Sequence, residues 1–167
     1  MMEFSGTQEL SVSPDDAWPY FTDTDVLAEC GPGVKEMHLR SPSDIEAVLA
    51  VGVGSVKPTF DVDVVVTEAE EPSRLRMKAT GDATRNAFEA VAEMDLMENG
   101  DGTSTVEWTA TASVSGLIAS LGKRALGSVT DRLVNDFFDD LEETIEAGEG
   151  ATSELEAAED EKAELDA

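Results

Sequence analysis

The sequence predicts an α+β fold in which one curved antiparallel sheet of about seven strands wraps around a single long helix near the C-terminus. Apolar and polar residues alternate along most of residues 37–114, as is typical of half-buried strands. Apolar residues recur every three or four positions over residues 117–145, as is typical of an amphipathic helix. The run Asn99-Gly100-Asp101-Gly102 is a strong hairpin signal and supports antiparallel pairing.

The N-terminal part of the chain predicts one strand followed by two short helices. Apolar and polar residues alternate over residues 3–12, as expected of a half-buried strand. Ser13-Pro14-Asp15-Asp16 then supplies a helix N-cap, a proline suited to the first helical position and acids that favour the helix dipole. A second short helix is expected over residues 25–29, and it ends at Cys30-Gly31-Pro32-Gly33.

The middle of the chain predicts four strands separated by turn-forming residues. The alternating segments cover residues 37–39, 45–51, 56–67 and 74–79. Turns are expected at residues 41–44, 71–73 and 81–82. Because proline has no N–H to donate, Pro58 predicts an edge or an irregular start for the strand that contains it.

The last two strands form a predicted hairpin whose buried faces have small residues at their centres. The inward residues are Phe88, Ala90, Ala92, Met94 and Leu96 on one strand and Val106, Trp108, Ala110, Ala112 and Val114 on the other. Alanines at the centre of a buried face either let a helix approach closely or leave an open volume. The sequence leaves both alternatives open.

The terminal helix, residues 117–145, is long enough to cross the sheet, at roughly 45 Å. Gly122 and Gly127 lie within this helix. Three explanations for them stay open: a kink, a bare patch facing a ligand, or a tolerated defect. The order of strand, two short helices, six strands and long helix describes a helix-grip architecture. We expect this domain to cover residues 1–147. The acidic segment 148–167 has almost nothing to bury and predicts a disordered or frayed tail.

The charge balance indicates a surface suited to a salt-rich cytoplasm. The chain has 37 acidic and 11 basic residues, which gives a formal net charge of −26. Self-repulsion on this scale destabilises a compact domain at low salt, but at about 1 M salt the Debye length falls to roughly 3 Å. A binder of basic partners is the alternative, which is disfavoured because the acids are spread along the whole chain. Nucleic acid is excluded as a partner because the chain has no basic stripe.

Several kinds of site are not expected in this chain. The weakly polar run over residues 47–56 is far shorter than the roughly 20 apolar residues that cross a bilayer. We therefore expect a cytoplasmic protein, and peripheral contact at the inner face of the membrane stays open. One cysteine, Cys30, and one histidine, His38, allow no internal disulfide and no multi-Cys or multi-His metal site. Cys30 as a nucleophile would need His38 as its base, and His38 is expected to face solvent.

Three spaced segments resemble one known family. They are Asp25-Val26-Leu27-Ala28-Glu29-Cys30-Gly31-Pro32-Gly33, Val51-Gly52-Val53-Gly54-Ser55-Val56-Lys57-Pro58-Thr59-Phe60, and Leu121-Gly122-Lys123-Arg124 running to Asn135-Asp136-Phe137-Phe138. In this order they resemble the carbon monoxide dehydrogenase G-subunit family, which belongs to the START-like, polyketide cyclase/dehydrase (SRPBCC) superfamily. The resemblance spans residues 2–145, and the acidic tail lies outside it.

The resemblance implies a hydrophobic cavity between the terminal helix and the sheet. It also implies an accessory role beside a molybdenum hydroxylase-type dehydrogenase, in membrane association or in handling a quinone or similar lipid. It does not imply dehydrogenase activity. Nothing in the sequence resembles a molybdopterin, flavin or iron–sulfur site, and one cysteine cannot hold a cluster. We expect no cofactor.

The candidate ligand-binding residues are those that the alternation places around the expected cleft. They are Gln8, Phe60, Met77, Phe88, Ala90, Ala92, Met94, Trp108 and Ala110 from the strands and Leu121 and Ala125 from the helix. The amides of Gln8 and Asn86 either orient a ligand carbonyl or bond to neighbouring backbone. The aromatic and methionine side chains either line a flat apolar ligand or fill the core. Cys30, Gly31, Pro32 and Gly33 form either a gate or a simple turn.

Three functions remain in competition at this point. The first is a non-enzymatic carrier of an apolar molecule, such as a quinone or isoprenoid lipid, with a dehydrogenase complex and transient membrane contact as further partners. The second is a cyclase- or aromatase-like enzyme, which the scarcity of inward titratable residues disfavours. The third is an assembly partner whose cleft is filled by side chains.

Overall fold

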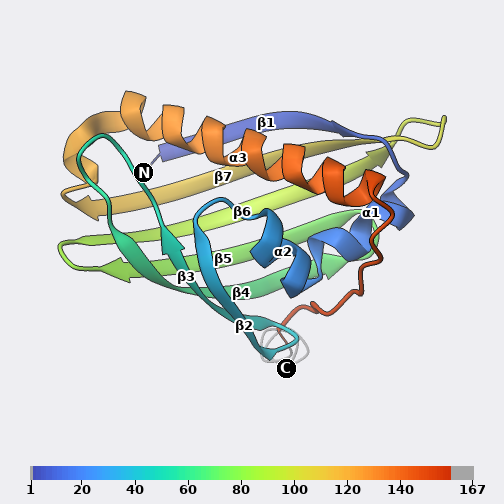
Figure 1. The fold of residues 1–167 in the computed structure, drawn as a ribbon, viewed down its shortest axis with the longest axis horizontal. Helices are drawn as coiled ribbons and strands as arrows, with labels where there is room; N and C mark the ends of the chain where they lie inside the picture. The colour runs from blue at the N-terminus through green and yellow to red at the C-terminus, as the bar shows by residue number, and fades with distance from the viewer. Residues whose placement is uncertain (1, 159–167) are drawn as a thin grey trace, which may run out of the picture.

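A computed structural model describes residues 2–158 as one seven-stranded antiparallel sheet, with two short helices at one end and a long helix across its inner face (Figure 1). The strands are β1 (Met2–Leu10), β2 (Val34–Ser41), β3 (Asp44–Ala50), β4 (Thr59–Glu70), β5 (Arg74–Ala83), β6 (Asn86–Glu98) and β7 (Ser104–Gly116). The helices are α1 (Pro14–Phe21), α2 (Thr24–Cys30), the 3-10 helix η1 (Ala119–Leu121) and α3 (Gly122–Glu146). The predicted helix-grip fold is confirmed.

The strand order explains how the sheet encloses α3. The order is β1-β7-β6-β5-β4-β3-β2, so β2 to β7 follow one another as hairpins and β1 pairs with β7. The chain passes from β1 to the opposite edge, β2, through α1 and α2. Figure 1 shows α3 above β1 and β7 while β3 and β2 curve up on the other side of the sheet. The inner face of β4 to β6 therefore lies between two raised walls.

Side-chain caps fix the start of each of the two short helices that the sequence predicts. The side chain of Ser13 accepts a hydrogen bond from the backbone N–H of Asp16 at 3.4 Å and caps α1. Oδ1 of Asp23 accepts from the N–H groups of Asp25 and Val26 and caps α2. Both helices bury an apolar face against the sheet, where Trp18 is 1% exposed.

The buried core forms two clusters at opposite ends of the sheet. One lies at the helical end, where α1 and α2 pack; its members include Leu10, Trp18, Phe21, Ile45, Val66, Val106, Phe138 and Leu141. The other lies at the loop end, which we define as the β3–β4 loop, the β5–β6 turn and the β7–α3 connection; its members are Ala47, Val53, Phe60, Val62, Ile118, Leu126 and Val129. The middle of the inner face lies between these clusters.

Gly81 does not form the turn expected at residues 81–82. Strand β5 continues to Ala83, and the chain reverses at Thr84 and Arg85, where Arg85 has a φ of 63°. Gly81 is instead buried against its register partner Phe88, and a Cβ at Gly81 would lie 2.1 Å from Cε2 of that ring. The glycine is needed for the close approach of an aromatic ring.

The long helix also begins later than expected. Residues 119–121 form a 3-10 turn, and Gly122, with a φ of +86°, begins α3. Gly122 therefore marks the junction between η1 and α3 instead of a kink inside one helix. Gly127 does lie within α3, and a Cβ there would be 3.9 Å from Cε1 of Phe4. Its bare backbone faces β1.

The start of the acidic tail is ordered, in contrast to the prediction of a disordered segment from residue 148. Leu155 is 3% exposed and belongs to the core cluster at the helical end. Backbone N–H groups of Glu154, Glu156 and Ala158 donate to the carbonyls of Thr22, Pro42 and Val66. One buried leucine and these bonds hold an otherwise polar segment. Residues 159–167 of the predicted tail lie outside the described residues.

Candidate functional site

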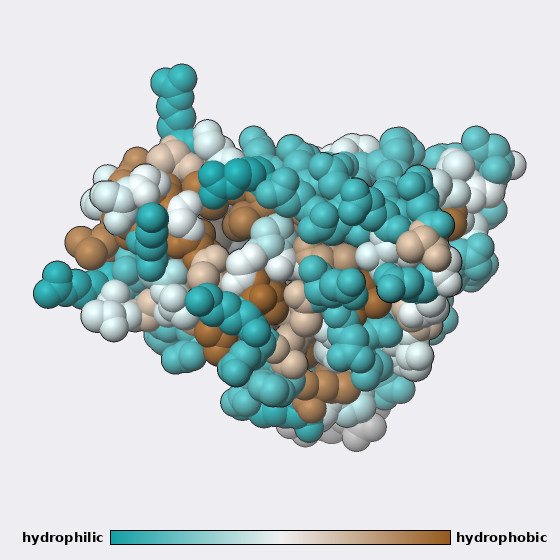
Figure 2. Space-filling model, viewed as in Figure 1, coloured by the Kyte–Doolittle hydropathy of each residue, from teal (hydrophilic) through white to brown (hydrophobic). Residues whose placement is uncertain are grey.

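The middle of the inner face is open. Ala92 points inward from the central strand β6, between its register partners Met77 and Ala110, yet it is exposed, and both partners are only partly buried. A packed core of this size would leave no solvent contact there. Figure 2 shows apolar side chains within a hollow between α3 and the raised β2–β3 side. Of the two alternatives for the central alanines, the structure therefore has the open volume.

The floor of this cleft contains most of the strand residues expected around it. Met77, Ala90, Met94, Trp108 and Ala110 all point inward and are all partly exposed. From α3 and the turn before it, Leu121 and Ala125 are partly buried and pack against the loop-end cluster. The structure brings these residues to one face, and whether each of them contacts a ligand stays a prediction.

Two wall residues were not assigned to the site from the sequence. Met37 of β2 and Val64 of β4 each pack against both core clusters, so they span the gap between them. Both are partly exposed. Their alternation marked them as inward-facing, but only the curvature of β2–β3 over the sheet shows that they face the cleft.

An aromatic pair closes the cleft at the loop end. The rings of Phe60 and Phe88 meet edge to face, with centroids 5.0 Å apart and planes at 80°. Phe60 is 1% exposed, so it is part of the packed loop-end core, whereas Phe88 is partly exposed. Of these two candidates, Phe88 is the one with surface left for a ligand.

The two buried-face amides have partners within the protein. Nε2 of Gln8 donates to Oδ1 of Asn135 on α3 at 3.1 Å, which ties β1 to the helix. Asn86 is 8% exposed; its Nδ2 donates to the Thr84 carbonyl at 3.0 Å and its Oδ1 accepts from the Ile118 N–H at 2.7 Å. Asn86 therefore holds the β7–α3 connection through backbone bonds, while Gln8 bonds to a side chain.

The indole of Trp108 lies against β1. A Cβ at Gly6, its register partner, would be 2.7 Å from Nε1 of Trp108, so only glycine allows this contact. The Nε1–H group is buried and has no hydrogen-bond acceptor within residues 2–158. A buried donor without an acceptor carries a desolvation cost.

The segment Cys30-Gly31-Pro32-Gly33 joins α2 to β2 and is held at both ends. The Gly31 N–H donates to the Leu27 carbonyl at 2.8 Å, and the Gly33 carbonyl accepts from the Ala50 N–H at 2.8 Å. Gly33 has a φ of +79°, and a Cβ there would lie 2.1 Å from the Ala50 carbonyl oxygen. These turn requirements account for the glycines, and a gate at this segment stays a prediction.

Cys30 itself is a core residue. It is 1% exposed, and its Sγ lies 3.6 Å from Oγ1 of Thr144 on α3. Burial raises the pKa of the Cys30 thiol, and the Thr144 contact offsets this only in part. His38 is exposed on the outer face of β2, consistent with the expectation that it faces solvent. A protonated, buried thiol is a poor nucleophile.

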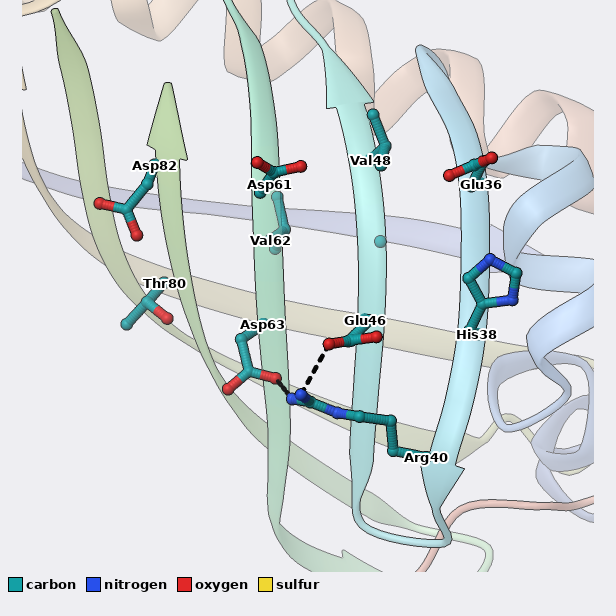
Figure 3. Close-up of a pocket in the computed structure, with 11 residues that line it drawn as sticks. Glu36, His38, Arg40, Glu46, Val48, Asp61, Val62, Asp63, Thr80 and Asp82 are labelled. Atoms are coloured by element: carbon teal, nitrogen blue, oxygen red, sulfur yellow. Dashed lines mark hydrogen bonds and ion pairs between the residues drawn. The ribbon is translucent and has the colours of Figure 1, made fainter. Parts of the chain in front are cut away.

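The outer face of the sheet has a shallow depression of about 430 Å³ that, unlike the apolar cleft, is lined by several charged side chains (Figure 3). Arg40 lies at its lower end and forms ion pairs with Asp44 at 2.8 Å, with Glu46 at 2.7 Å and with Asp63. Hydrogen bonding to Asp44 is the main cause that raises the pKa of Arg40. Further carboxylates line the depression, from Glu36, Asp61 and Asp82. This surface is acidic and does not suit an apolar ligand.

Comparison with known proteins decides the family. Residues 6–146, which are most of the chain, match the family described as CoxG, the G subunit of carbon monoxide dehydrogenase. The chain belongs to this CoxG family. The resemblance read from the three sequence segments is therefore confirmed. A comparison with curated proteins finds no significant match.

Solved structures share the fold of this CoxG-family chain. A conserved protein from Geobacillus kaustophilus has 26% sequence identity and a TM-score of 0.84, and the match covers 90% of this chain and 99% of that one. A START superfamily protein from Mycobacterium smegmatis has 12% identity and a TM-score of 0.67 over 87% and 97% of the two chains. The Zhui aromatase/cyclase from Streptomyces sp. R1128 has 13% identity and a TM-score of 0.64 over 90% and 99%. The last two similarities show that the chain shares the START-like fold.

Proposed function

We propose that this CoxG-family protein is a non-enzymatic carrier of an apolar molecule, a quinone or an isoprenoid lipid, and that it serves a molybdenum hydroxylase-type dehydrogenase. The observation that carries the proposal is the exposure of Ala92 in the middle of the inner face, between two packed clusters. The family's description supports the link to a dehydrogenase.

The surroundings of Ala92 suit a flat or flexible apolar ligand. Met77, Met94 and Met37 border the open region, and methionine side chains adapt their shape to a ligand at little cost. Burying apolar ligand surface there contributes about 25 cal/mol per Å² before ordering costs. The unsatisfied Nε1–H of Trp108 favours a ligand with a carbonyl oxygen, which would supply an acceptor once the indole turns away from Gly6.

A cyclase- or aromatase-like enzyme is less well supported. The floor and wall residues described above carry no carboxylate, imidazole or amine, so none of them can act as a general acid or base near neutral pH. The two amides, Gln8 and Asn86, are occupied by protein partners. The similarity to the aromatase/cyclase is at 13% identity and concerns the fold.

The proposal is tested by ligand retention. The protein is purified without detergent, its lipid extract is examined by mass spectrometry, and its melting temperature is measured with added menaquinone and ubiquinone. We expect a retained apolar molecule or a rise in melting temperature. A protein that shows neither would hold no apolar ligand in the cleft and would fit an assembly partner better, and the carrier proposal would be wrong.

A pair of variants on one strand locates the site. Ala92→Phe fills the open volume, and we expect ligand retention to fall at least tenfold while the protein still folds. Val91→Phe, the neighbouring residue on the outer face of β6, adds a ring outside the cleft and should leave retention unchanged. Equal retention by a folded Ala92→Phe variant would contradict the placement of the ligand.

A further inference from the structure

The ordered start of the acidic tail, residues 148–158, joins the two walls of the cleft, and we call this segment the strap. It leaves the end of α3, which forms one wall, and passes α1 to reach the turn between β2 and β3, which form the other wall (Figure 1). The strap lies outside residues 6–146, which match the family. The fold that the family shares therefore does not account for it.

The first half of the strap is fastened to the junction between α1 and α2. Oδ2 of Asp23 accepts a hydrogen bond from the Thr152 N–H at 2.8 Å. Oε1 of Glu154 accepts from both the N–H and the hydroxyl of Thr24, at 2.7 and 2.9 Å. Leu155 follows and is 3% exposed within the core cluster at the helical end. One leucine and two carboxylates thus seat the strap at this junction.

The second half of the strap holds the turn between β2 and β3. The Glu156 N–H donates to the carbonyl of Pro42 in this turn at 2.7 Å. The Ala158 N–H donates to the carbonyl of Val66 on β4 at 3.0 Å. The Val66 N–H in turn donates to the carbonyl of Ser43 in the same turn at 2.9 Å. The strap therefore extends a network of backbone bonds that ties the turn to β4.

The wall that the strap holds borders the cleft. Met37 of β2 is partly exposed and packs against both core clusters, so it lies beside the open region. At the opposite end of the cleft, Nη2 of Arg132 on α3 donates to the Gly52 carbonyl of the β3–β4 loop at 3.1 Å. Release of the strap would therefore open the cleft at the helical end while this bond still holds the loop end.

The strap can leave its seat at low cost. Gly148, with a φ of +75°, follows α3, and a Cβ at Gly148 or Gly150 would meet nothing within 4 Å. Residues 133–158 contain nine acids, residues 11–33 contain five, and neither range has a lysine or arginine that could offset their repulsion. A segment held by few apolar contacts opens locally at a lower free energy than the whole domain.

We propose that the strap is a clamp that controls ligand exchange. While the strap is seated, it holds the β2–β3 wall toward α3 and keeps the helical end of the cleft closed around an apolar ligand. When the strap is released, this wall moves outward near Met37, and the ligand enters or leaves. Because it takes the cleft to hold a ligand, this regulation rests on the proposed function.

Hydrogen exchange of the ligand-free, full-length protein tests the clamp at about 1 M KCl, where self-repulsion is screened. Glu154→Ala removes the bonds from Thr24, and Leu155→Asp removes the apolar anchor. In both variants we expect the Val66 N–H and the amides of β2 and β3 to exchange about tenfold faster. Amides of β6 and β7 should keep their rates, because a local opening leaves the rest of the sheet folded.

Two matched variants are the controls. Glu146→Ala makes the same change on an exposed side chain of α3, and Leu117→Asp makes the same change at a leucine that is 47% exposed. Both should exchange like the unaltered protein. Equal acceleration in all strands would mean that the strap only adds stability, and unchanged rates in β2 and β3 would mean that it does not hold the wall. Either result would overturn the proposal.

Release of a neutral apolar dye, Nile red, separates the clamp from the carrier function. We expect the bound dye to leave Glu154→Ala and Leu155→Asp about tenfold faster than it leaves the unaltered protein and the two controls, as measured by stopped-flow fluorescence. Unchanged release from variants whose β2 and β3 exchange faster would overturn the role of the clamp in ligand exchange. If the unaltered protein binds no dye, the carrier proposal fails, whereas hydrogen exchange still decides whether the strap holds the wall.

Discussion

Asn86 and Ile118, 32 residues apart in the chain, are joined by a hydrogen bond of 2.7 Å from the Ile118 backbone N–H to the Asn86 side-chain oxygen. The bond is buried, and it fixes the point where the chain leaves β7 and turns toward α3. Ile118 is 5% exposed within the loop-end core. One amide thus sets the position of the helix that forms one wall of the cleft.

Replacing Asn86 by alanine should therefore lower the free energy of unfolding by about 1–3 kcal/mol, because the Ile118 N–H is left buried without an acceptor. Gln8→Ala is the control: it removes an amide whose hydrogen bond, to Asn135, is exposed, so its loss should cost less. Urea unfolding at neutral pH measures both. If the two variants are equally destabilised, the Ile118 bond is not the cause.

The ordered tail segment should contribute to stability through Leu155. Leu155→Ala removes a side chain that is 3% exposed, and we expect a loss of about 2–5 kcal/mol in the free energy of unfolding. Leu117→Ala is the matched control, because that leucine is 47% exposed and should change stability by less than about 0.5 kcal/mol. A Leu155→Ala variant as stable as the control would mean that the tail does not pack in solution.

The sequence predicts the fold well because alternation and helical period report directly which side of an element is buried. The tail was predicted less well, because a single leucine among acids carries no period, and its burial depends on a groove formed by distant residues. The sequence predicts a turn at Gly81 because glycine is common both in turns and in close contacts with rings, and only the register with Phe88 separates the two.

The inward positions of the candidate residues were predictable from the sequence, whereas the shape of the cleft was not. The inward positions of Ala92 and Met77 follow from the alternation, but the exposure of Ala92 depends on α3 lying over β1 and β7.

The buried thiol of Cys30 should make stability depend on alkaline pH. Burial raises the pKa of the Cys30 thiol in the folded state. The contribution of the protonated thiol to the free energy of unfolding is therefore fully present below the unfolded thiol pKa of about 8.5, and it is lost as the pH rises through the folded pKa. The stability of the unaltered protein should therefore fall relative to Cys30→Ala as the pH rises above about 8.5. Urea unfolding of both proteins across this range is the measurement, and a constant difference would contradict it.

Salt should stabilise the protein strongly. With a net charge of −26, self-repulsion opposes the folded state, and raising KCl from about 0.1 M to about 1 M shortens the Debye length from roughly 10 Å to roughly 3 Å. We expect the melting temperature to rise over this range, as measured by circular dichroism. Sucrose, which is not ionic, is the control for general effects of a cosolute. A melting temperature that rises no more in KCl than in sucrose would show that repulsion between the acidic residues does not limit the stability of the folded state.

One pair of carboxylates should account for a measurable part of that repulsion. Asp61 on β4 and Asp82 on β5 are direct register partners on the outer face, and like charges in opposed positions destabilise a sheet. Asp82→Asn should therefore raise the free energy of unfolding at low salt by a few tenths of a kcal/mol, and the gain should vanish at about 1 M KCl. Glu93→Gln removes the same charge from a carboxylate that pairs with Arg74 and Arg76, so it should give no gain at low salt. If both variants gain equally, total charge matters and the Asp61–Asp82 register does not.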